Sequence, residues 1–172
     1  MPDQPRVLID EERIAARITE LGKEIRAVYG DETVVCVGIL KGSFLFMADL
    51  IRKIEGPVQC AFLGVASYEG TKSTGVVRIT HDTRLKLEEH HVLVVEDIVD
   101  TGLTLDYILR ILGQRKLKSL RVCALLDKPS RRKTEVLVDF VGFEIPPEFV
   151  IGYGLDLDEY WRNLPYVGIY DG

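Results

Sequence analysis

The segment that most constrains the fold of this chain is a short apolar run at residues 92–95, which acidic residues follow at once. Three valines and a leucine in succession predict a strand buried on both faces, as is typical of parallel sheets. Glu96 and Asp97 come next, and Asp100 precedes a turn at Gly102. In open parallel sheets the carboxyl edge is where ligands bind, so these carboxylates are candidates for a site.

Other segments of the chain alternate between strand-like and helix-like patterns. Apolar residues recur at helical spacing between residues 10 and 29, which predicts a helix. Asp10 is a plausible N-cap residue, and Gly30 is a plausible end of the helix. Helical spacing also marks residues 44–51 and 105–112. The strand-like runs are residues 34–40, 60–65, 121–126 and 136–141, with residues 75–79 as one strand of a hairpin or arm.

This alternation predicts an α/β fold with a mainly parallel central sheet flanked by helices. The length of 172 residues suits a single domain. We expect its core at about residues 30–145. The weaker, proline-containing ends, at about residues 1–10 and 145–172, are expected to form a small hood lobe.

Composition argues against several other classes of protein. No apolar run approaches the ~20 residues that cross a bilayer, and the first residues predict no signal peptide. Cys36, Cys60 and Cys123 are scattered within apolar runs, which disfavours a disulfide framework and favours a reducing cytoplasm. The net charge of −5 disfavours sequence-independent nucleic-acid binding. We therefore expect a cytoplasmic protein with no membrane or nucleic-acid partner.

The turn after the central strand has the features of a phosphate site. Residues 100–104 (Asp-Thr-Gly-Leu-Thr) precede a helix, whose first amides and the hydroxyls of Thr101 and Thr104 would cradle one phosphate. Glu96 and Asp97 could flank the same ligand or hold a hard cation through water. The ordinary alternative is a helix capped by Asp100 or Thr104, with solvated acids.

Residues 94–104 (Val-Val-Glu-Asp-Ile-Val-Asp-Thr-Gly-Leu-Thr) resemble the phosphoribosyl pyrophosphate signature of the type I phosphoribosyltransferases. The chain most resembles the purine-salvage branch, the hypoxanthine-guanine phosphoribosyltransferases, from about residue 7 to 170. The resemblance implies transfer of a phosphoribosyl group from 5-phospho-α-D-ribose 1-diphosphate to hypoxanthine or guanine, giving IMP or GMP and pyrophosphate. It also implies Mg²⁺ as cofactor and a homodimer or homotetramer.

The resemblance also implies roles for residues of the signature. Asp100 would lie near N7 of the purine as general acid or base, and Glu96 and Asp97 would contact the ribose and metal. The 5′-phosphate would bind the loop formed by Asp100, Thr101, Gly102, Leu103 and Thr104. Some family members carry Lys where this chain has Leu103, so any phosphate contact there is expected from the backbone.

Further roles follow from the same resemblance. Lys41 and Gly42, after a peptide that is often cis, would bind pyrophosphate together with Arg162. Lys128 would contact the six-position oxygen of the base, and Asp156 would lie near a second metal. The purine site would comprise Ile98, Lys128, Phe149, Val150 and Asp156. Residues 67–86, with Ser67 and Tyr68, would form a mobile lid, and residues 131–133 are interpreted as a solvated basic loop.

Two alternatives stay open from the sequence. One is a phosphoribosyltransferase for xanthine or another base on the same scaffold, because the sugar site is common to all. The other is a regulator that senses phosphoribosyl pyrophosphate, although the acidic net charge and the retained acid pair favour catalysis.

Overall fold

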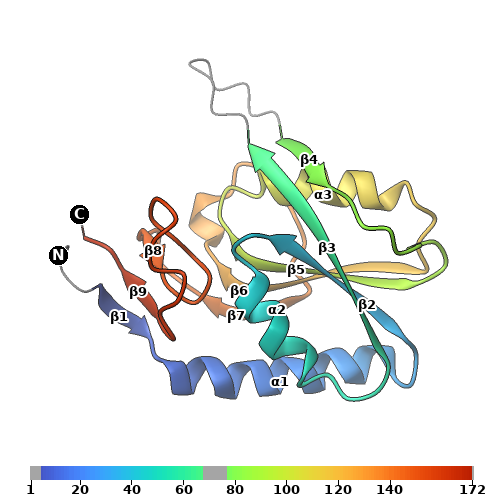
Figure 1. The fold of residues 1–172 in the computed structure, drawn as a ribbon, viewed down its shortest axis with the longest axis horizontal. Helices are drawn as coiled ribbons and strands as arrows, with labels where there is room; N and C mark the ends of the chain where they lie inside the picture. Colours follow the sequence, from blue (N-terminus) through green and yellow to red (C-terminus); the bar gives the residue numbers. More distant parts are fainter. Residues whose placement is uncertain (1–4, 68–76, 172) are drawn as a thin grey trace.

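The computed structural model describes residues 5–67 and 77–171, which form one larger and one smaller β-sheet (Figure 1). The larger sheet has six strands in the order β4-β3-β2-β5-β6-β7, in which β4 is antiparallel to β3 and the other neighbours are parallel. Its strands are β2 (Val34–Leu40), β3 (Val58–Ser67), β4 (Val77–His81), β5 (His91–Val99), β6 (Ser119–Asp127) and β7 (Phe140–Glu144).

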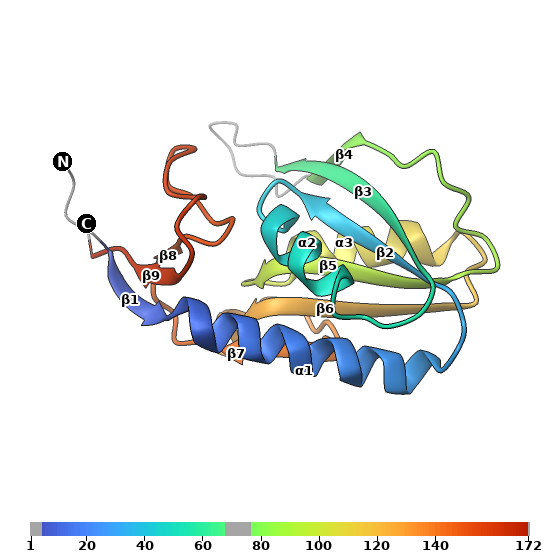
Figure 2. The ribbon, with the colours of Figure 1, turned by 60° about the horizontal axis from the view of Figure 1, so that its bottom comes forward.

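Helices cover both faces of this sheet. Helices α1 (Glu11–Tyr29) and α2 (Phe44–Ile51) pack with alternate strand residues such as Cys36 and Leu93. Helix α3 (Leu103–Gly113) covers the opposite face, where Val35 and Val94 are buried (Figure 2). The central strands are therefore apolar on both faces, which explains their unbroken hydrophobic runs.

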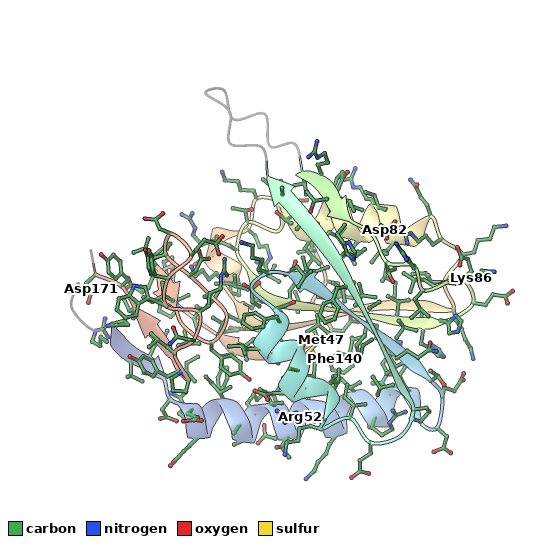
Figure 3. All side chains as sticks on the ribbon, viewed as in Figure 1. Met47, Arg52, Asp82, Lys86, Phe140 and Asp171 are labelled. Atoms are coloured by element: carbon green, nitrogen blue, oxygen red, sulfur yellow. The ribbon has the colours of Figure 1, made fainter. Side chains whose placement is uncertain are left out.

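Side chains follow the same layering in Figure 3. Met47 of α2 and Phe140 of β7 are buried, with exposed fractions of 1% and 6%. Arg52, just past the end of α2, is exposed and lies at the periphery. Among the described helices, none is long and apolar enough to cross a membrane.

The first helix begins and ends where its sequence predicts. The Asp10 carboxylate accepts a hydrogen bond from the backbone N–H of Arg13 at 2.8 Å, which caps one free amide of the first turn. Gly30 ends the helix with φ of +56°, a conformation that favours glycine. Both predicted boundary residues are confirmed.

The two chain ends meet in the smaller sheet. Strand β9 (Val167–Ile169) lies between β1 (Arg6–Ile9) and β8 (Val150–Ile151), and both pairings are antiparallel. In Figure 2 the strands β2, β5 and β6 run toward this hood, so their carboxyl ends face it. The α/β class, the mainly parallel sheet and the hood lobe are confirmed.

Two predicted strand boundaries are wrong. The central strand does not end at residue 95, because β5 continues through the acidic residues to Val99. The strand expected at residues 136–141 begins only at Phe140 and ends at Glu144. Val136 and Val138 pack against the core on the α3 side, so alternate apolar residues mimic a strand outside the sheet. Strand β4 pairs with β3 as the expected arm, although residues 75 and 76 lie outside the described part.

Candidate active site

A cavity of about 490 Å³ lies where the carboxyl ends of β2 and β5 meet a segment of the hood. The end of β2 contributes Lys41 and Gly42, and the hood contributes Asp156 and Arg162. These segments are far apart in sequence but converge because parallel strands share one carboxyl edge. The lining residues are Ile39, Leu40, Lys41, Gly42, Val65, Glu96, Asp97, Ile98, Thr104, Asp156 and Arg162.

Two neighbouring carboxylates form the floor of this cavity. Side chains alternate along a strand, so Glu96 and Asp97 of β5 are expected to face opposite ways. Both nevertheless line the cavity. The Asp97 carboxylate accepts a hydrogen bond from the backbone N–H of Ile98 at 2.9 Å. Burial, followed by the charge of Asp97, raises the pKa of Glu96 well above its ordinary value. Burial also raises the pKa of Asp97, against the opposing effect of the Ile98 N–H. This environment favours a cation beside the pair.

The turn after β2 approaches these acids as closely as the backbone allows. The peptide between Leu40 and Lys41 is cis, as the family resemblance implies. A Cβ atom on Gly42 would lie only 1.7 Å from Oδ2 of Asp97. A Cβ on Gly154, in the hood, would lie 2.1 Å from the carbonyl oxygen of Gly42. Glycine at both positions therefore allows three segments to meet beside the cavity.

Lys41 and Arg162 share one carboxylate that the sequence reasoning missed. Glu159 Oε1 lies 2.7 Å from Nζ of Lys41, and its Oε2 lies 3.1 Å from Nη2 of Arg162. The Lys41 ammonium and then the Arg162 guanidinium lower the pKa of Glu159. Arg162 also contacts Asp156 Oδ1 at 3.0 Å and donates to the carbonyl of Gly154 at 2.7 Å. The signal available in the sequence was only the spacing of Glu159 and Arg162 by three residues.

A smaller cavity of about 110 Å³ adjoins the acids at the start of α3. Gly102 occupies the N-cap position of α3 with φ of +84°, and Oγ1 of Thr101 accepts a hydrogen bond from the backbone N–H of Leu103 at 3.4 Å. The alternative in which Asp100 or Thr104 caps α3 is therefore wrong. The lining residues are Glu96, Ile98, Val99, Asp100, Thr101, Gly102, Thr104 and Leu105, whereas Leu103 is exposed and does not line this cavity.

Asp100 lies beside two cations from the segment after β6. Lys128 is buried, with its Nζ 3.7 Å from Oδ2 of Asp100. Nε of Arg131 donates to Oδ1 of Asp100 at 3.1 Å. Arg132 is largely buried and donates to the main-chain carbonyls of Val99 and Asp100. The interpretation of residues 131–133 as a solvated loop is wrong for Arg132, whereas Arg131 is exposed, as expected, and pairs with Asp100.

The expected base-binding residues are more dispersed. Ile98 lines both cavities, but Phe149 is 52% exposed and Val150 is buried in β8, and neither lines the larger cavity. The ring of Phe149 meets that of Tyr170 edge to face, at 6.4 Å between centroids. Ser67 ends β3, and Tyr68 lies outside the described residues.

The acids of the site suit a hard cation with few protein ligands. Within residues 5–67 and 77–171, no three or more His, Cys, Asp or Glu side chains gather as a metal cluster. Glu96, Asp97 and Asp156 therefore share a cavity without forming one three-carboxylate centre. Magnesium commonly takes one or two carboxylates and completes its shell with water and phosphate oxygens, so the buried pair fits it.

A parallel sheet with a phosphate-sized cavity at its carboxyl edge is the architecture of proteins that bind sugar phosphates or nucleotides. The model of the phosphoribosyl transferase domain family matches residues 8–158, and the chain belongs to that family. The family that residues 94–104 indicated is thereby confirmed.

Curated relatives place the chain near one branch of this family. It is 46% identical over 168 residues to the hypoxanthine-guanine phosphoribosyltransferase of Bacillus subtilis, covering 97% of this chain and 93% of the relative. It is 50% identical over 166 residues to the hypoxanthine phosphoribosyltransferase of Haemophilus influenzae, covering 94% and 93%.

Solved structures agree with this placement. A crystal structure of a hypoxanthine phosphoribosyltransferase from Staphylococcus aureus superposes with a TM-score of 0.91 at 48% identity, covering 95% of this chain and 90% of that one. A hypoxanthine-guanine phosphoribosyltransferase from Bacillus anthracis, solved with a HEPES molecule in its active site, gives 0.93 at 41% identity, covering 97% and 99%.

Proposed function

We propose that this chain is a purine-salvage enzyme of the pentosyltransferase class. It joins hypoxanthine or guanine to 5-phospho-α-D-ribose 1-diphosphate and releases IMP or GMP and pyrophosphate. The observation that carries the proposal is the pair of adjoining cavities. One is of phosphate size at the start of α3, and the other is lined by acids and cations. The names of the similar proteins point to the same reaction.

The reaction separates charge at the anomeric carbon, and the cavity provides groups for both signs. As the bond to pyrophosphate breaks, positive charge develops on the ribose and negative charge on the leaving group. Lys41, the Gly42 N–H and Arg162 would stabilise the pyrophosphate. Glu96 and Asp97 would hold the ribose hydroxyls, and their negative charge favours the cationic sugar. The 5′-phosphate would bind residues 100–104.

Asp100 is proposed as the general acid or base at N7 of the purine. Lys128 Nζ lies 3.7 Å from its carboxylate, so both polar groups face one region beside the phosphate loop. We assign Lys128 to the six-position oxygen of the base, which would favour oxo-purines over adenine. Phe149 would stack on the base, and the backbone of Val150 would pair with its edge. Ile98 and Asp156 would complete this purine site.

Magnesium is the proposed cofactor: Glu96 and Asp97 would hold one ion, and Asp156 would lie near a second. When bound, it would neutralise charge on the pyrophosphate as the leaving group departs. Residues 67–86, including Ser67 and Tyr68, are proposed as a lid that excludes water from the activated sugar. Together with the core at about residues 30–145 and the hood, the lid belongs to one phosphoribosyltransferase domain.

We further propose that the chain forms a homodimer or homotetramer in the cytoplasm. Phe44 of α2 and Phe62 of β3 are exposed by 40% and 37%. A Cβ on Gly38 of β2 would lie 3.0 Å from the Phe62 ring, so this ring lies across β2 while part of it stays exposed. Aromatic side chains are enriched at protein interfaces. Cys36, Cys60 and Cys123 are free thiols, as a reducing compartment favours.

A panel of bases tests the proposed function. The purified chain is incubated with Mg²⁺, phosphoribosyl pyrophosphate and hypoxanthine, guanine, xanthine, adenine or uracil, and pyrophosphate release is followed. We expect release with hypoxanthine or guanine and little with adenine or uracil. Release with xanthine or uracil alone would support the other-base alternative. Binding of phosphoribosyl pyrophosphate without turnover on any base would support the regulator.

A further inference from the structure

The segment after β6 lies against the end of β5 and the loop at residues 100–104, here called the phosphate loop, and it bonds to the carbonyls of residues 99, 100 and 101. We call residues 128–134 the strap. The carbonyl of Val99 accepts from the backbone N–H of Lys128 at 3.0 Å. The carbonyl of Thr101 accepts from the backbone N–H of Lys133 at 2.9 Å. Between them, Arg132 is the strap side chain that reaches the loop backbone.

One nitrogen of Arg132 donates to two successive backbone carbonyls. Its Nη1 donates to the carbonyl of Val99 at 3.0 Å and to that of Asp100 at 2.7 Å. Its Nη2 pairs with the carboxylate of Asp127, the last residue of β6, which is 7% exposed. The guanidinium is therefore fixed to the sheet on one side and to the loop on the other. Only a planar, multiply donating group can make this set of bonds.

The bonded carbonyls determine where the amides of the loop point. In a trans peptide the C=O and the following N–H lie in one plane and point in opposite directions. Carbonyls of residues 99, 100 and 101 that turn toward the strap leave the N–H groups of residues 100, 101 and 102 on the other side. Those three residues line the 110 Å³ cavity. A Cβ on Gly102 would lie 3.1 Å from the carbonyl of Thr134, so the strap also contacts the loop directly.

We propose that Arg132 is a positioning residue for the 5′-phosphate subsite: with Asp127 it holds the loop so that its amides face the phosphate. This inference rests on the proposed function and adds a residue that the family resemblance did not supply. Arg132 is not among the residues that line either of the two cavities. Its contribution acts through the backbone.

The test compares ligands that do and do not use the loop. Dissociation constants of IMP and of inorganic pyrophosphate are measured by calorimetry for the wild type, R132Q and R132K. We expect R132Q to weaken IMP binding about 10- to 100-fold, because displacement of a binding group by about 1 Å has effects of that size. Pyrophosphate binding should change less than about twofold, since its proposed site at Lys41 and Arg162 is separate. R132K should lose nearly as much IMP affinity as R132Q. Added methylguanidine should restore part of the IMP affinity that R132Q loses.

The matched control is K133Q, which removes one positive charge from the same strap. The Lys133 side chain is exposed, and this residue bonds to the loop only through its backbone N–H. K133Q should therefore bind IMP within about twofold of the wild type. If R132Q loses no more IMP affinity than K133Q, or loses affinity for IMP and pyrophosphate equally, the proposed role is wrong.

Two further outcomes are decisive. If R132Q does not fold, R132K with the same ligand pair decides, and IMP affinity equal to the wild type would overturn the inference. Failure of the wild type itself to bind IMP would overturn the proposed function instead, so the two failures are distinguishable.

Discussion

A single methyl group at Gly42 should disable the pyrophosphate end of the cavity. In Gly42→Ala the new Cβ would lie 1.7 Å from Oδ2 of Asp97, whereas real Cβ contacts are essentially never under 3.0 Å. The loop or the carboxylate must therefore move by at least 3.0 − 1.7 = 1.3 Å. Asp97 has little freedom to retreat, because its Oδ1 accepts from the Ile98 N–H at 2.9 Å and the side chain adjoins Glu96. A displacement of this size in an active site costs about 100-fold in rate, or about 2.7 kcal/mol.

The assay is pyrophosphate release from phosphoribosyl pyrophosphate with hypoxanthine and Mg²⁺, read as kcat/KM. Gly113→Ala is the matched control, since it makes the same change at the last residue of α3, where nothing lies within 4 Å of the new Cβ. That variant should keep wild-type activity and gain about 0.5–1 kcal/mol in unfolding free energy. Folded Gly42→Ala with kcat/KM within about threefold of the wild type would refute the reasoning, because the close contact would then have no catalytic consequence.

Other substitutions test the remaining groups. Asp100→Ala should lower kcat about 10²–10⁴-fold through loss of proton transfer while IMP still binds, and a kcat within about threefold of the wild type would contradict its role. Lys128→Ala should reduce the ratio of kcat/KM for hypoxanthine to that for adenine, and an unchanged ratio would remove it from base recognition. Glu96→Gln should raise the thermal midpoint of the metal-free protein, because it removes one of two adjacent buried carboxylates. It should also lessen the further stabilisation by Mg²⁺ with phosphoribosyl pyrophosphate. A lower thermal midpoint of the metal-free variant would count against this account. Glu159→Gln should tighten pyrophosphate binding about two- to fivefold, as Lys41 loses a competing carboxylate, whereas weaker binding would mean that Glu159 orients that lysine.

Local sequence patterns were sufficient for the layers of the fold and for one end of the site. Periodicity identified the buried strand β5 and the helix after it, and Asp10 and Gly30 marked the ends of α1 because capping depends on neighbouring residues alone. The family resemblance indicated that the peptide before Lys41 is often cis, and the structure shows that it is cis in this chain. The end of β5 was misjudged because polar residues at 96 and 97 read as the start of a loop, although the strand continues through them.

Contacts between distant segments were not available from the sequence. Glu159 lies 118 residues from Lys41, and the bond between them exists only because the hood folds over the carboxyl edge. Arg132 belongs to a run of basic residues whose composition is typical of solvated loops. In the structure its side chain is instead held by hydrogen bonds to the carbonyls of Val99 and Asp100, more than thirty residues earlier in the chain. The hydrophobic pattern of a sequence does not predict a contact of this kind, because the contact depends on how the strands are ordered in the sheet.

The cation behind the loop at residues 100–104 and the cation at the end of β2 are paired in different ways, and this has a physical consequence. The Arg132 side chain is 18% exposed and lies behind the phosphate loop, paired with Asp127 at the end of β6, whose side chain is 10% exposed. A phosphate bound on the other side of the loop, as proposed, would leave those bonds in place, because it would take amides that already face it. Lys41 and Glu159 are 66% and 62% exposed, and their carboxylate–ammonium bond occupies the group proposed for pyrophosphate. If the proposed assignments hold, pyrophosphate would have to replace an existing partner, whereas the 5′-phosphate would enter a preformed cradle. The loop at residues 100–104 would then be the more rigid anchor for a ligand that spans both ends.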